Sequence, residues 1–293
     1  MQALLLMTVL LSALPKSDSS TSTLYDTVRD IESRPETDDD RLRIMRHAYD
    51  EGIPPALRSL ECDSIPIDRR EDLFLATHLV VVHRPDALLV DRLICLHDAI
   101  VATNNARPYH HHRVHGVLVA SRRFSAANQL RSKFGISVSE LPALELAGGT
   151  GPRRLLLSED GVTDVPWPNQ EGWQIVAVVH PHCAPSQRAM SKVMDGSTWS
   201  WMLPMLTLLV PAGSAWEEGE MRKWNAHYPT HPMAAEVPGR TPKGVATNET
   251  PVFHLLQNGR VIDTLRGMPE DGEVLEAWRS RVVEEPMERR RSP

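Results

Sequence analysis

The sequence predicts a protein in two parts: an all-α helical array, followed by an α/β domain whose mixed central sheet has helices on both faces. Two observations lead to this fold class. Over residues 23–145, apolar side chains recur three and four positions apart, which is the spacing of amphipathic helices. After the segment 148–152 (GGTGP), Val- and Leu-rich strands alternate with helical stretches, and a hairpin and a final helix follow. The glycine-rich segment interrupts all periodicity and therefore marks the domain boundary.

Composition excludes several classes of protein. The 293 residues suffice for two ordinary domains, and 41% apolar with 24% charged residues fits neither a disordered chain nor a protein with several membrane spans. A formal net charge of −6 gives no overall basic field, so we expect no nucleic-acid partner. The motifs of nucleotide-binding loops, zinc proteases and serine hydrolases do not occur in the sequence, and we expect no cofactor.

Residues 1–19 are predicted to be a signal peptide or an N-terminal hydrophobic segment. The first 14 residues are mostly apolar, too few to span a bilayer, and they resemble the apolar core of a secretory signal. Gln2 stands where a signal usually has Lys or Arg, and a buried first helix is the alternative. We favour export to the periplasm or the exterior, with no stable membrane span and with signal cleavage left open.

Residues 20–148 form the predicted helical domain. Its helix pairs across tight turns resemble tetratricopeptide-type hairpins, although the sequence does not repeat regularly at the tetratricopeptide spacing of about 34 residues. A plain helical bundle is an equally good interpretation. The expected helices cover residues 24–34, 40–52, 72–83, 87–102, 113–124 and 125–135.

Residues 152–285 form the predicted α/β domain, and residues 286–293 a charged, disordered tail. Asn258-Gly259 between two alternating runs is a strong hairpin signal. Strands are expected to begin near residues 154, 173, 206, 252 and 260, and helices to cover residues 184–194, 217–228 and 270–283.

A cysteine lies where a buried strand meets a helix. The Val-rich strand 175–179 runs directly into the segment 180–186 (HPHCAPS), which contains Cys183. Downstream, the segment 250–253 (TPVF) begins a later strand. In this element order the two motifs resemble the active-site and cis-proline segments of the thioredoxin-like superfamily, as a single-cysteine variant over about residues 153–284.

The resemblance implies roles for several residues. Cys183 would be the nucleophile, and Pro185 corresponds to the proline of the family's usual Cys-x-Pro-Cys motif. The family also implies a cis peptide bond before Pro251 and an extended substrate strand docked on the backbone of Thr250. The candidate substrate-binding residues are therefore Thr250, Pro251 and Pro185.

The chemistry of Cys183 also follows from its position alone. A thiol at the first turn of a helix is close to unpaired N–H groups and to the positive end of the helix dipole, and both favour the nucleophilic thiolate. Ser186 can present its hydroxyl to the sulfur, and a protonated His182 would lower the thiol pKa further. The candidate catalytic residues are therefore Cys183, Ser186 and His182.

The chain departs from the family at several positions. Ser186 replaces the second cysteine, Ala177 a buried acid and His182 a tryptophan. One sulfur cannot form an internal disulfide, so mixed disulfides remain as the available chemistry, and an inert thiol on a binding scaffold is the competing interpretation.

The Trp-rich stretch 198–205 and the loop 231–248 look like additions to a minimal domain. The tryptophans either grip unfolded clients or, as we prefer, pack under the insertion.

Cys62 and Cys95, which are 33 residues apart, form a candidate disulfide. In an exported protein such a bridge would persist and would contribute roughly 3–4 kcal/mol by loop closure. Two ordinary core cysteines are an equal alternative, because free cysteine is among the most buried residue types. With a bridge, Cys183 would be the single free thiol.

Histidines form two clusters in the sequence. His180 and His182, next to Cys183, offer nitrogen and sulfur donors that suit copper or zinc. We nevertheless predict no metal site, with His180 and His182 as the candidates if one exists. The run 110–112 with His115 we interpret as a solvated helix start.

Taken as a whole, the sequence predicts an exported thioredoxin-like protein that exchanges thiols and disulfides through Cys183, with cysteine-containing client proteins as its partners. The first alternative is a non-catalytic interaction or assembly factor of the cell envelope, which would bind a partner protein through the same fold. The second alternative is copper or zinc handling in the periplasm. Whether the protein is an enzyme depends on the reactivity of Cys183.

Overall fold

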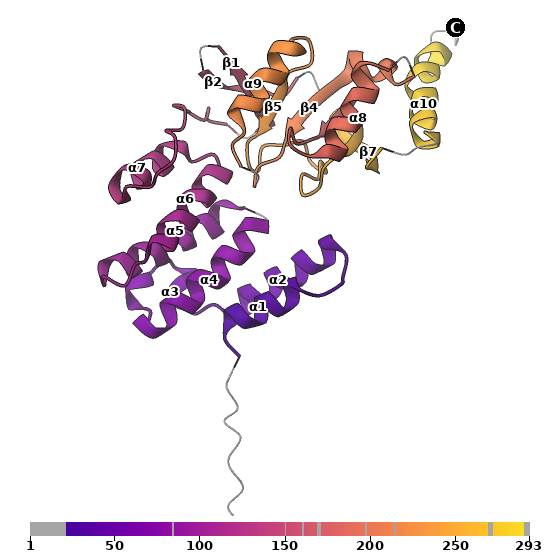
Figure 1. The fold of residues 1–293 in the computed structure, drawn as a ribbon. Helices are drawn as coiled ribbons and strands as arrows, with labels where there is room; N and C mark the ends of the chain where they lie inside the picture. The colour runs from indigo at the N-terminus through magenta and orange to yellow at the C-terminus, as the bar shows by residue number, and fades with distance from the viewer. Residues whose placement is uncertain are drawn as a thin grey trace, which may run out of the picture.

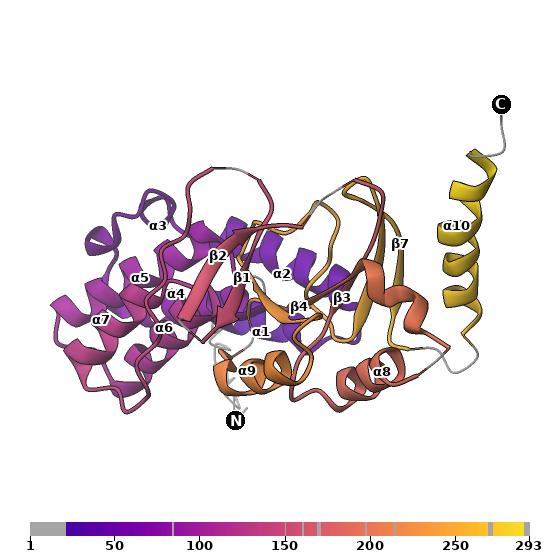
Figure 2. The same ribbon diagram turned by 90° about the horizontal axis from the view of Figure 1, so that it is seen from above.

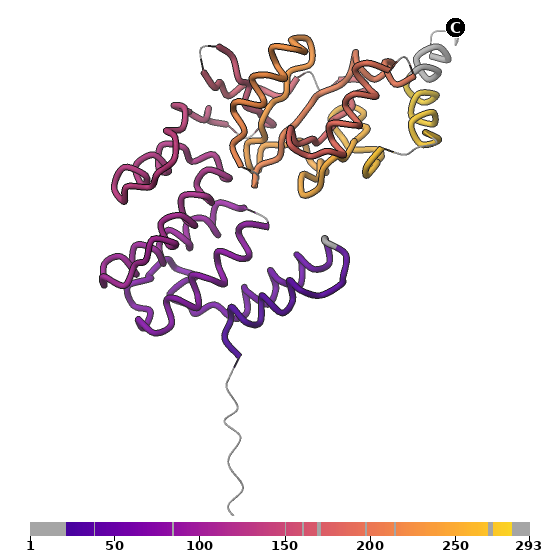
Figure 3. Tube along the Cα trace, viewed as in Figure 1, coloured from indigo at the N-terminus to yellow at the C-terminus, as the bar shows by residue number. Residues whose placement is uncertain are grey.

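The computed structural model describes the chain from residue 22 to residue 289 with short gaps (Figures 1 and 3). The described ranges are 22–83, 85–149, 151–159, 161–168, 171–196, 198–213, 215–268 and 272–289. The predicted signal segment 1–19 and residues 290–293 of the predicted tail lie outside them. Within these ranges, no helix is both long and apolar enough to cross a membrane.

The N-terminal part of the chain is helical, as predicted. Its elements are α1 (Leu24–Glu32), α2 (Asp38–Gly52), α3 (Pro55–Arg58), the 3-10 helix η1 (Cys62–Ser64), α4 (Ile67–His83), α5 (Ala87–Ala102), α6 (Pro108–Ala120) and α7 (Phe124–Phe134). α4 lies in the middle of this helical region and contacts α1, α2, α5 and α6 (Figure 1). α3 and η1 were not predicted, because a single turn is too short to show helical periodicity.

Polar residues set several helix boundaries. The side chains of Thr23, Thr37 and Asp86 each accept an amide hydrogen bond from the first turn of the helix that follows, at the starts of α1, α2 and α5. Gly135 ends α7 in the left-handed conformation, with a φ of 63° that glycine adopts without strain. These ends can be recognised in the sequence, and the predicted helices accordingly lie close to the observed ones.

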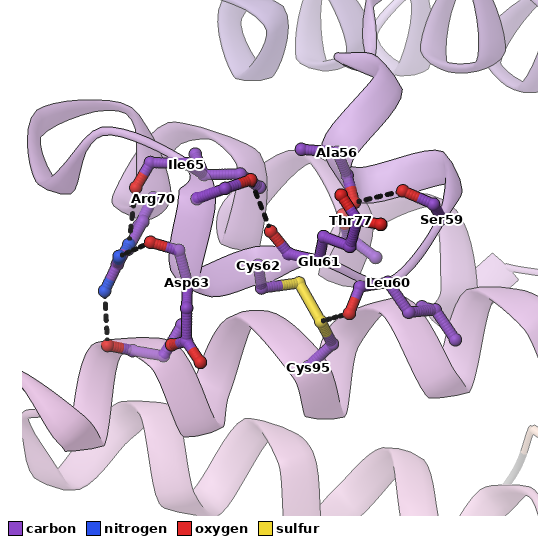
Figure 4. Close-up of a disulfide and its surroundings, with 12 residues drawn as sticks. Ala56, Ser59, Leu60, Glu61, Cys62, Asp63, Ile65, Arg70, Thr77 and Cys95 are labelled. Carbon is purple, nitrogen blue, oxygen red and sulfur yellow. Dashed lines mark hydrogen bonds between the residues drawn. A yellow bond between two sulfur atoms is a disulfide. The ribbon is translucent and has the colours of Figure 1, made fainter.

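A disulfide joins Cys62 of η1 to Cys95 of α5, with the two Cα atoms 5.8 Å apart (Figure 4). The buried guanidinium of Arg70 holds the same loop, because it donates hydrogen bonds to the carbonyl oxygens of Asp63 and Ala99 at 2.8 and 2.6 Å. η1 is only three residues long, so these contacts rather than its own hydrogen bonds attach it to α4 and α5. The remaining cysteine, Cys183, is a free thiol.

The α/β region contains a seven-stranded mixed sheet, which confirms the predicted fold class. Its elements are β1 (Arg153–Ser158), β2 (Gly161–Pro166), β3 (Trp173–Val178), α8 (Ala184–Met194), η2 (Ser200–Met205), β4 (Leu206–Val210), α9 (Glu218–His227), β5 (Met233–Glu236), β6 (Val252–Gln257), β7 (Arg260–Arg266) and α10 (Glu273–Arg289). The strand order is β2-β1-β5-β4-β3-β6-β7, and β3, β4 and β5 are parallel. The unit β3–α8–β4, followed by the antiparallel pair β6 and β7 and by α10, is the thioredoxin-like order. The first residues of the segment 286–293, predicted to be a disordered tail, belong to α10.

Two strands, β2 and β5, are absent from the prediction. β5 lies inside the segment 231–248, which we interpreted as an inserted loop, and it is instead an interior strand between β4 and β1. Its four residues, MAAE, are all buried, so neither alternation nor a β-branched run marks them as a strand. β2 pairs with β1 in a hairpin at the edge of the sheet.

The helices of the α/β region place their buried side chains on one face of the sheet. Met190 of α8, Met221 of α9 and Trp278 of α10 belong to a single core. The connections β3–α8–β4 and β4–α9–β5 step across the sheet in the same direction, and because such crossovers are right-handed, both helices lie on one side (Figure 2). Trp167 and Val245 cover the opposite face. From the sequence we expected helices on that face as well.

The helical region packs against the ends of the central strands (Figure 1). Arg122, in the turn between α6 and α7, is buried and donates hydrogen bonds to the carbonyl oxygens of Pro211 and Glu236 at 3.2 and 3.4 Å. Its guanidinium lies over the ring of Trp216, 5.0 Å from the ring centroid, and Phe124 meets the same ring edge-on. Pro211 follows β4 and Glu236 ends β5, so the helical region lies beside the carboxyl ends of the parallel strands.

Candidate functional site

Cys183 is the N-cap residue of α8, after the turn that follows β3. Its amide donates to the carbonyl oxygen of His180 at 3.0 Å, and its own carbonyl accepts the amide of Gln187 at 2.9 Å. Pro185 lies in the first turn of the helix, where a missing N–H leaves no donor unsatisfied. Cys183 is partly exposed at the positive end of the helix dipole, which favours the thiolate.

Ser186 lies beside the Cys183 sulfur and is only 1% exposed. Its Oγ accepts the amide of His180 at 3.2 Å, so its hydroxyl proton is available to the sulfur. Burial raises the pKa of the Cys183 thiol. Hydrogen bonding with the hydroxyl side chains of Ser186 and Thr250 lowers it, the charge of Arg188 lowers it further, and together they hold the pKa of the thiol below its ordinary value.

The peptide bond between Thr250 and Pro251 is cis. The carbonyl oxygen of Thr250 faces the thiol, and the Sγ of Cys183 donates a weak hydrogen bond to it across 3.7 Å. The carbonyl oxygen of Pro251 accepts the amide of Gly267 at 2.9 Å, which attaches this loop to the end of β7. Tertiary structure therefore brings the loop to a thiol that is 67 residues earlier in the chain.

His182 and His180 have partners of their own. The Nε2 of His182 lies 3.1 Å from a carboxylate oxygen of Glu217, and the predicted influence of His182 on the thiol stays a prediction. The Nδ1 of His180 accepts the amide of His182 at 3.2 Å, and burial lowers the pKa of His180. In the described part of the chain, no three His, Cys, Asp or Glu side chains gather as the ligands of a metal ion would.

Two charged residues of this site were not predicted. Arg188 is on α8, and its charge favours the Cys183 thiolate. The sequence signal for this role is a basic residue within two helical turns of the cysteine. Glu236 is buried at the end of β5, where its carboxylate accepts the amide of Ala212 at 2.7 Å and the hydroxyl of Thr247 at 3.2 Å. Burial raises the pKa of Glu236. Glu236 fastens the segment before the cis-proline to the sheet, and nothing in the sequence indicates this role because β5 itself is not recognisable.

A hollow of about 680 Å³ lies between the helical region and the α/β region. Thr250, His180 and Glu236 line it from the α/β region, and Asp39 and Val82 from the helical region. We call this space the cis-proline hollow. Thr250, whose carbonyl oxygen lies 3.7 Å from the Cys183 sulfur, connects this hollow to the thiol, although Cys183 itself is not in the lining.

A second hollow, of about 640 Å³, is lined by His182 and will be called the His182 hollow. Glu217 and Trp216 form its wall on the α/β region, and His115 of α6 belongs to its wall on the helical region. Gly213 lies in the lining of both hollows, so the two are neighbours. We call the two hollows together the cleft; His182, next to Cys183 in sequence, lines one, and Thr250, whose carbonyl oxygen the sulfur contacts, lines the other.

The histidines near the start of α6 are more buried than predicted. The Nδ1 of His110 accepts the amide of Arg107 at 2.9 Å, and its Nε2 lies 2.7 Å from a carboxylate oxygen of Glu71. His110 is fully buried and His115 nearly so. The interpretation of the run 110–112 as a solvated helix start is therefore wrong for His110, because α4 supplies a carboxylate partner that sequence spacing cannot show.

The Trp-rich stretch 198–205 contributes to the core rather than projecting from it. Trp199 and Trp201 are partly buried against the core that α8 and α10 share. The ring of Trp199 lies so close to Gly272 that a Cβ there would come within 2.3 Å of it. These contacts favour the packing interpretation over an exposed lip for clients.

Comparison with known proteins finds likeness only among solved structures. No protein-family model and no curated protein matches the sequence. A solution structure assigned as a thioredoxin from Neisseria meningitidis is 16% identical with a TM-score of 0.34, over 46% of this chain and 90% of its own. A crystal structure assigned as a thiol:disulfide interchange protein DsbE from Chlorobium tepidum is 21% identical with a TM-score of 0.32, over 47% and 99%. A thioredoxin-like protein from Bacteroides caccae is 12% identical with a TM-score of 0.29, over 94% and 98%. These scores are low, and the thioredoxin-like fold of β1 to α10 rests on its own strand order and on the place of Cys183 within it.

Proposed function

We propose that the protein exchanges thiols and disulfides through Cys183 by forming mixed disulfides with cysteine-containing client proteins. The observation that carries this proposal is the environment of the sulfur. Cys183 is partly exposed at a helix start, Ser186 lies beside it, and its pKa is lowered. An inert structural cysteine would be buried among apolar side chains, with a raised pKa.

The chemistry needs no oxidant beyond the client itself. The Cys183 thiolate attacks one sulfur of a client disulfide, a new S–S bond forms to Cys183, and the other client sulfur leaves with the electron pair as a thiolate. A client thiolate then attacks the mixed disulfide, forms a new client disulfide and releases the Cys183 thiolate. The number of disulfides is unchanged, so the cycle rearranges disulfides rather than creating them.

Ser186 determines which reactions are open to the protein. In place of a second cysteine, it cannot resolve a mixed disulfide from within the molecule, so the mixed disulfide persists until another thiol arrives. This favours rearrangement or holding of clients over the net oxidation or reduction that a two-cysteine site performs.

We also propose that the protein works outside the cytoplasm. The Cys62–Cys95 disulfide suits an oxidising compartment, where structural disulfides persist. The signal-like segment 1–19 is consistent with export and lies outside the described residues. A fusion of these residues to a reporter enzyme that is active only after export would test this location.

The function itself is tested by trapping and by titration. The full chain is incubated with a peptide disulfide, and the adduct is located by mass spectrometry. Because Cys62 and Cys95 are bridged, the expected single adduct is at Cys183, and Cys183→Ala forms none. In parallel, the rate of alkylation of Cys183 against pH gives the thiol pKa.

An absence of adducts together with a thiol pKa of about 8.5 or higher, the value of an unperturbed cysteine, would refute exchange. It would favour the alternative of a non-catalytic interaction factor, which uses the same cleft for binding alone.

A further inference from the structure

The cis-proline hollow is lined by acidic side chains close to the thiol. Asp39 and Asp86 belong to its wall on the helical region, and Glu249 directly precedes Thr250 on the other side. Among the described residues that line it, none is a lysine or an arginine. A polypeptide that is joined to Cys183 and leaves through this hollow therefore passes several carboxylates.

Asp86 pairs with Arg46 of α2, whereas Asp39 and Glu249 have a single basic partner between them. One guanidinium, that of Arg266, serves both Asp39, at 3.6 Å, and Glu249. The side chain of Asp39 is still 73% exposed, so it remains accessible to a further cation. Two carboxylates that share one guanidinium leave a negative charge beside Thr250, where a nearby cation is attracted.

Acidic side chains also line the neighbouring His182 hollow. Glu217, Glu218 and Glu220 line it; Glu218 pairs with Arg222 and Glu220 with Lys223 behind the wall, whereas Glu217 has only the imidazole of His182, at 3.1 Å. Its wall also includes His115, which is 8% exposed and whose Nε2 has no hydrogen-bond partner in the described part of the chain. A buried ring nitrogen without a partner is costly, so it indicates a polar occupant that can bond to it.

We propose that this cleft selects client segments in which lysine or arginine flanks the reacting cysteine, with the helical region as the second wall of the binding site. The proposal rests on exchange at Cys183, as proposed above. The occupant is an extended, cationic polypeptide on both sides of its cysteine. Glutathione, which is short and anionic, gains no attraction from either hollow and is a poor partner.

The test compares peptides that differ only in charge. Each carries one cysteine as a mixed disulfide with 2-thiopyridine, flanked on both sides by lysine, by serine or by glutamate. The Cys183 thiolate attacks the peptide sulfur and releases 2-thiopyridine, whose absorbance gives the rate. We expect the lysine peptide to react about tenfold faster than the glutamate peptide at low ionic strength. We expect the difference to shrink in about 0.5 M salt, where charges are screened over a few ångströms.

A pair of variants assigns the selection to the cleft. Asp39→Asn combined with Glu249→Gln is expected to reduce the lysine-to-glutamate rate ratio several-fold, and Asp39→Asn alone to reduce it less. Glu276→Gln, at an exposed carboxylate on α10 that pairs with Arg279, is the matched control and should leave the ratio unchanged. Circular dichroism verifies that each variant is folded.

The outcomes separate this proposal from the function on which it rests. Equal rates for the three peptides, or a faster glutamate peptide, would overturn charge selection while leaving exchange at Cys183 intact. A preference for lysine that the double variant does not change would overturn the placement in this cleft. No reaction with any peptide would overturn the proposed function, and charge selection with it.

Discussion

At the scale of single residues, the reactivity of Cys183 depends on neighbours from different parts of the chain. Ser186 lies one turn along the same helix, whereas Thr250 arrives from a loop 67 residues later. A serine in place of a second cysteine keeps a hydrogen-bond donor beside the sulfur but removes the resolving thiol. The site therefore retains the stabilisation of its thiolate and loses the internal disulfide.

Replacement of Ser186 by alanine should weaken this stabilisation. A hydrogen bond to a charged group contributes roughly 1.5 kcal/mol, so we expect the rate of Cys183 alkylation near neutral pH to fall by about tenfold in Ser186→Ala. The pKa of the thiol should rise, which a pH series of alkylation rates measures. Ser191→Ala on the exposed side of α8 is the matched control. A rate unchanged in Ser186→Ala would show that the hydroxyl does not act on the sulfur.

At the scale of elements, the shortest ones depend on single tertiary connections. η1 has three residues and is attached to α5 through the Cys62–Cys95 disulfide. β5 has four residues and exists because β4 and β1 pair with it on both sides. Neither element has enough local hydrogen bonding or periodicity to be stable, or recognisable, by itself.

Removal of the disulfide should therefore destabilise the helical region. Closure of a loop of 33 residues is expected to contribute roughly 3–4 kcal/mol, so the Cys62→Ala/Cys95→Ala variant should lose about that much free energy of unfolding in urea. Wild-type protein in reductant should lose a similar amount, whereas Cys183→Ala should lose little. Equal midpoints for the double variant and the wild type would contradict a stabilising bridge.

At the scale of the whole molecule, Arg122 is the buried member of several contacts between the two regions, which include the Asp39–Arg266 pair. Arg122 has a φ of 60°, a conformation unusual for a residue with a Cβ, and its side chain reaches the ends of β4 and β5. Burial lowers the pKa of Arg122 to about 10, although the negative charge of Glu236 raises that pKa in part. The guanidinium is therefore still charged at neutral pH. This contact therefore helps to hold the helical region beside the α/β region, with the cleft between them.

Loss of this arginine should uncouple the two regions. In Arg122→Ala two buried carbonyl oxygens lose their donor, at a cost of roughly 2–4 kcal/mol. All seven tryptophans lie between residues 167 and 278, so their fluorescence reports unfolding of the α/β region, whereas circular dichroism reports mainly the helices. We expect the two signals to coincide in the wild type and to separate in the variant. Arg123→Ala, next in sequence but bonded to Asp91 and Ala87 within the helical region, should keep them together. Coincident signals in Arg122→Ala would contradict the coupling.

Acid should weaken the folded state through its buried histidines. Burial, and then the charge of Arg113, lower the pKa of His78 from 6.5 to about 4. The unfolded chain therefore takes up this proton first, so the free energy of unfolding falls as the pH decreases from about 6.5 to about 4. Burial also lowers the pKa of His254, which acts in the same direction. Glu236, whose pKa is raised by burial, acts in the opposite direction at the acidic end, and we expect the histidines to dominate.

Urea denaturation at a series of pH values measures this dependence. In His78→Gln the free energy of unfolding should change less between neutral pH and pH 4.5. The exposed His47 supplies the control, and His47→Gln should keep the wild-type slope. A slope that His78→Gln does not alter would rule out His78 as its source.

The sequence determines most of the architecture because much of the signal is local. Helix caps at Thr23, Thr37 and Asp86, the buried strand before Cys183 and the hairpin at Asn258-Gly259 are each set by a few adjacent residues. The same local signal places the thiol at a helix start, with Ser186 on the next turn. The elements that show clear periodicity or turn chemistry were predicted, whereas the short elements α3, η1 and β5 and the edge strand β2 were not.

Tertiary structure decides what surrounds the thiol. β5, which ends in Glu236, is a strand because it pairs with β1 and β4. His110 has a carboxylate partner 39 residues away in the sequence. The cleft lies between two regions that Arg122 joins across 114 residues of sequence, through its hydrogen bond to Glu236. Contacts between distant segments depend on how elements pack, which no local pattern encodes, so the sequence predicted the position of Cys183 at a helix start but not the walls around it.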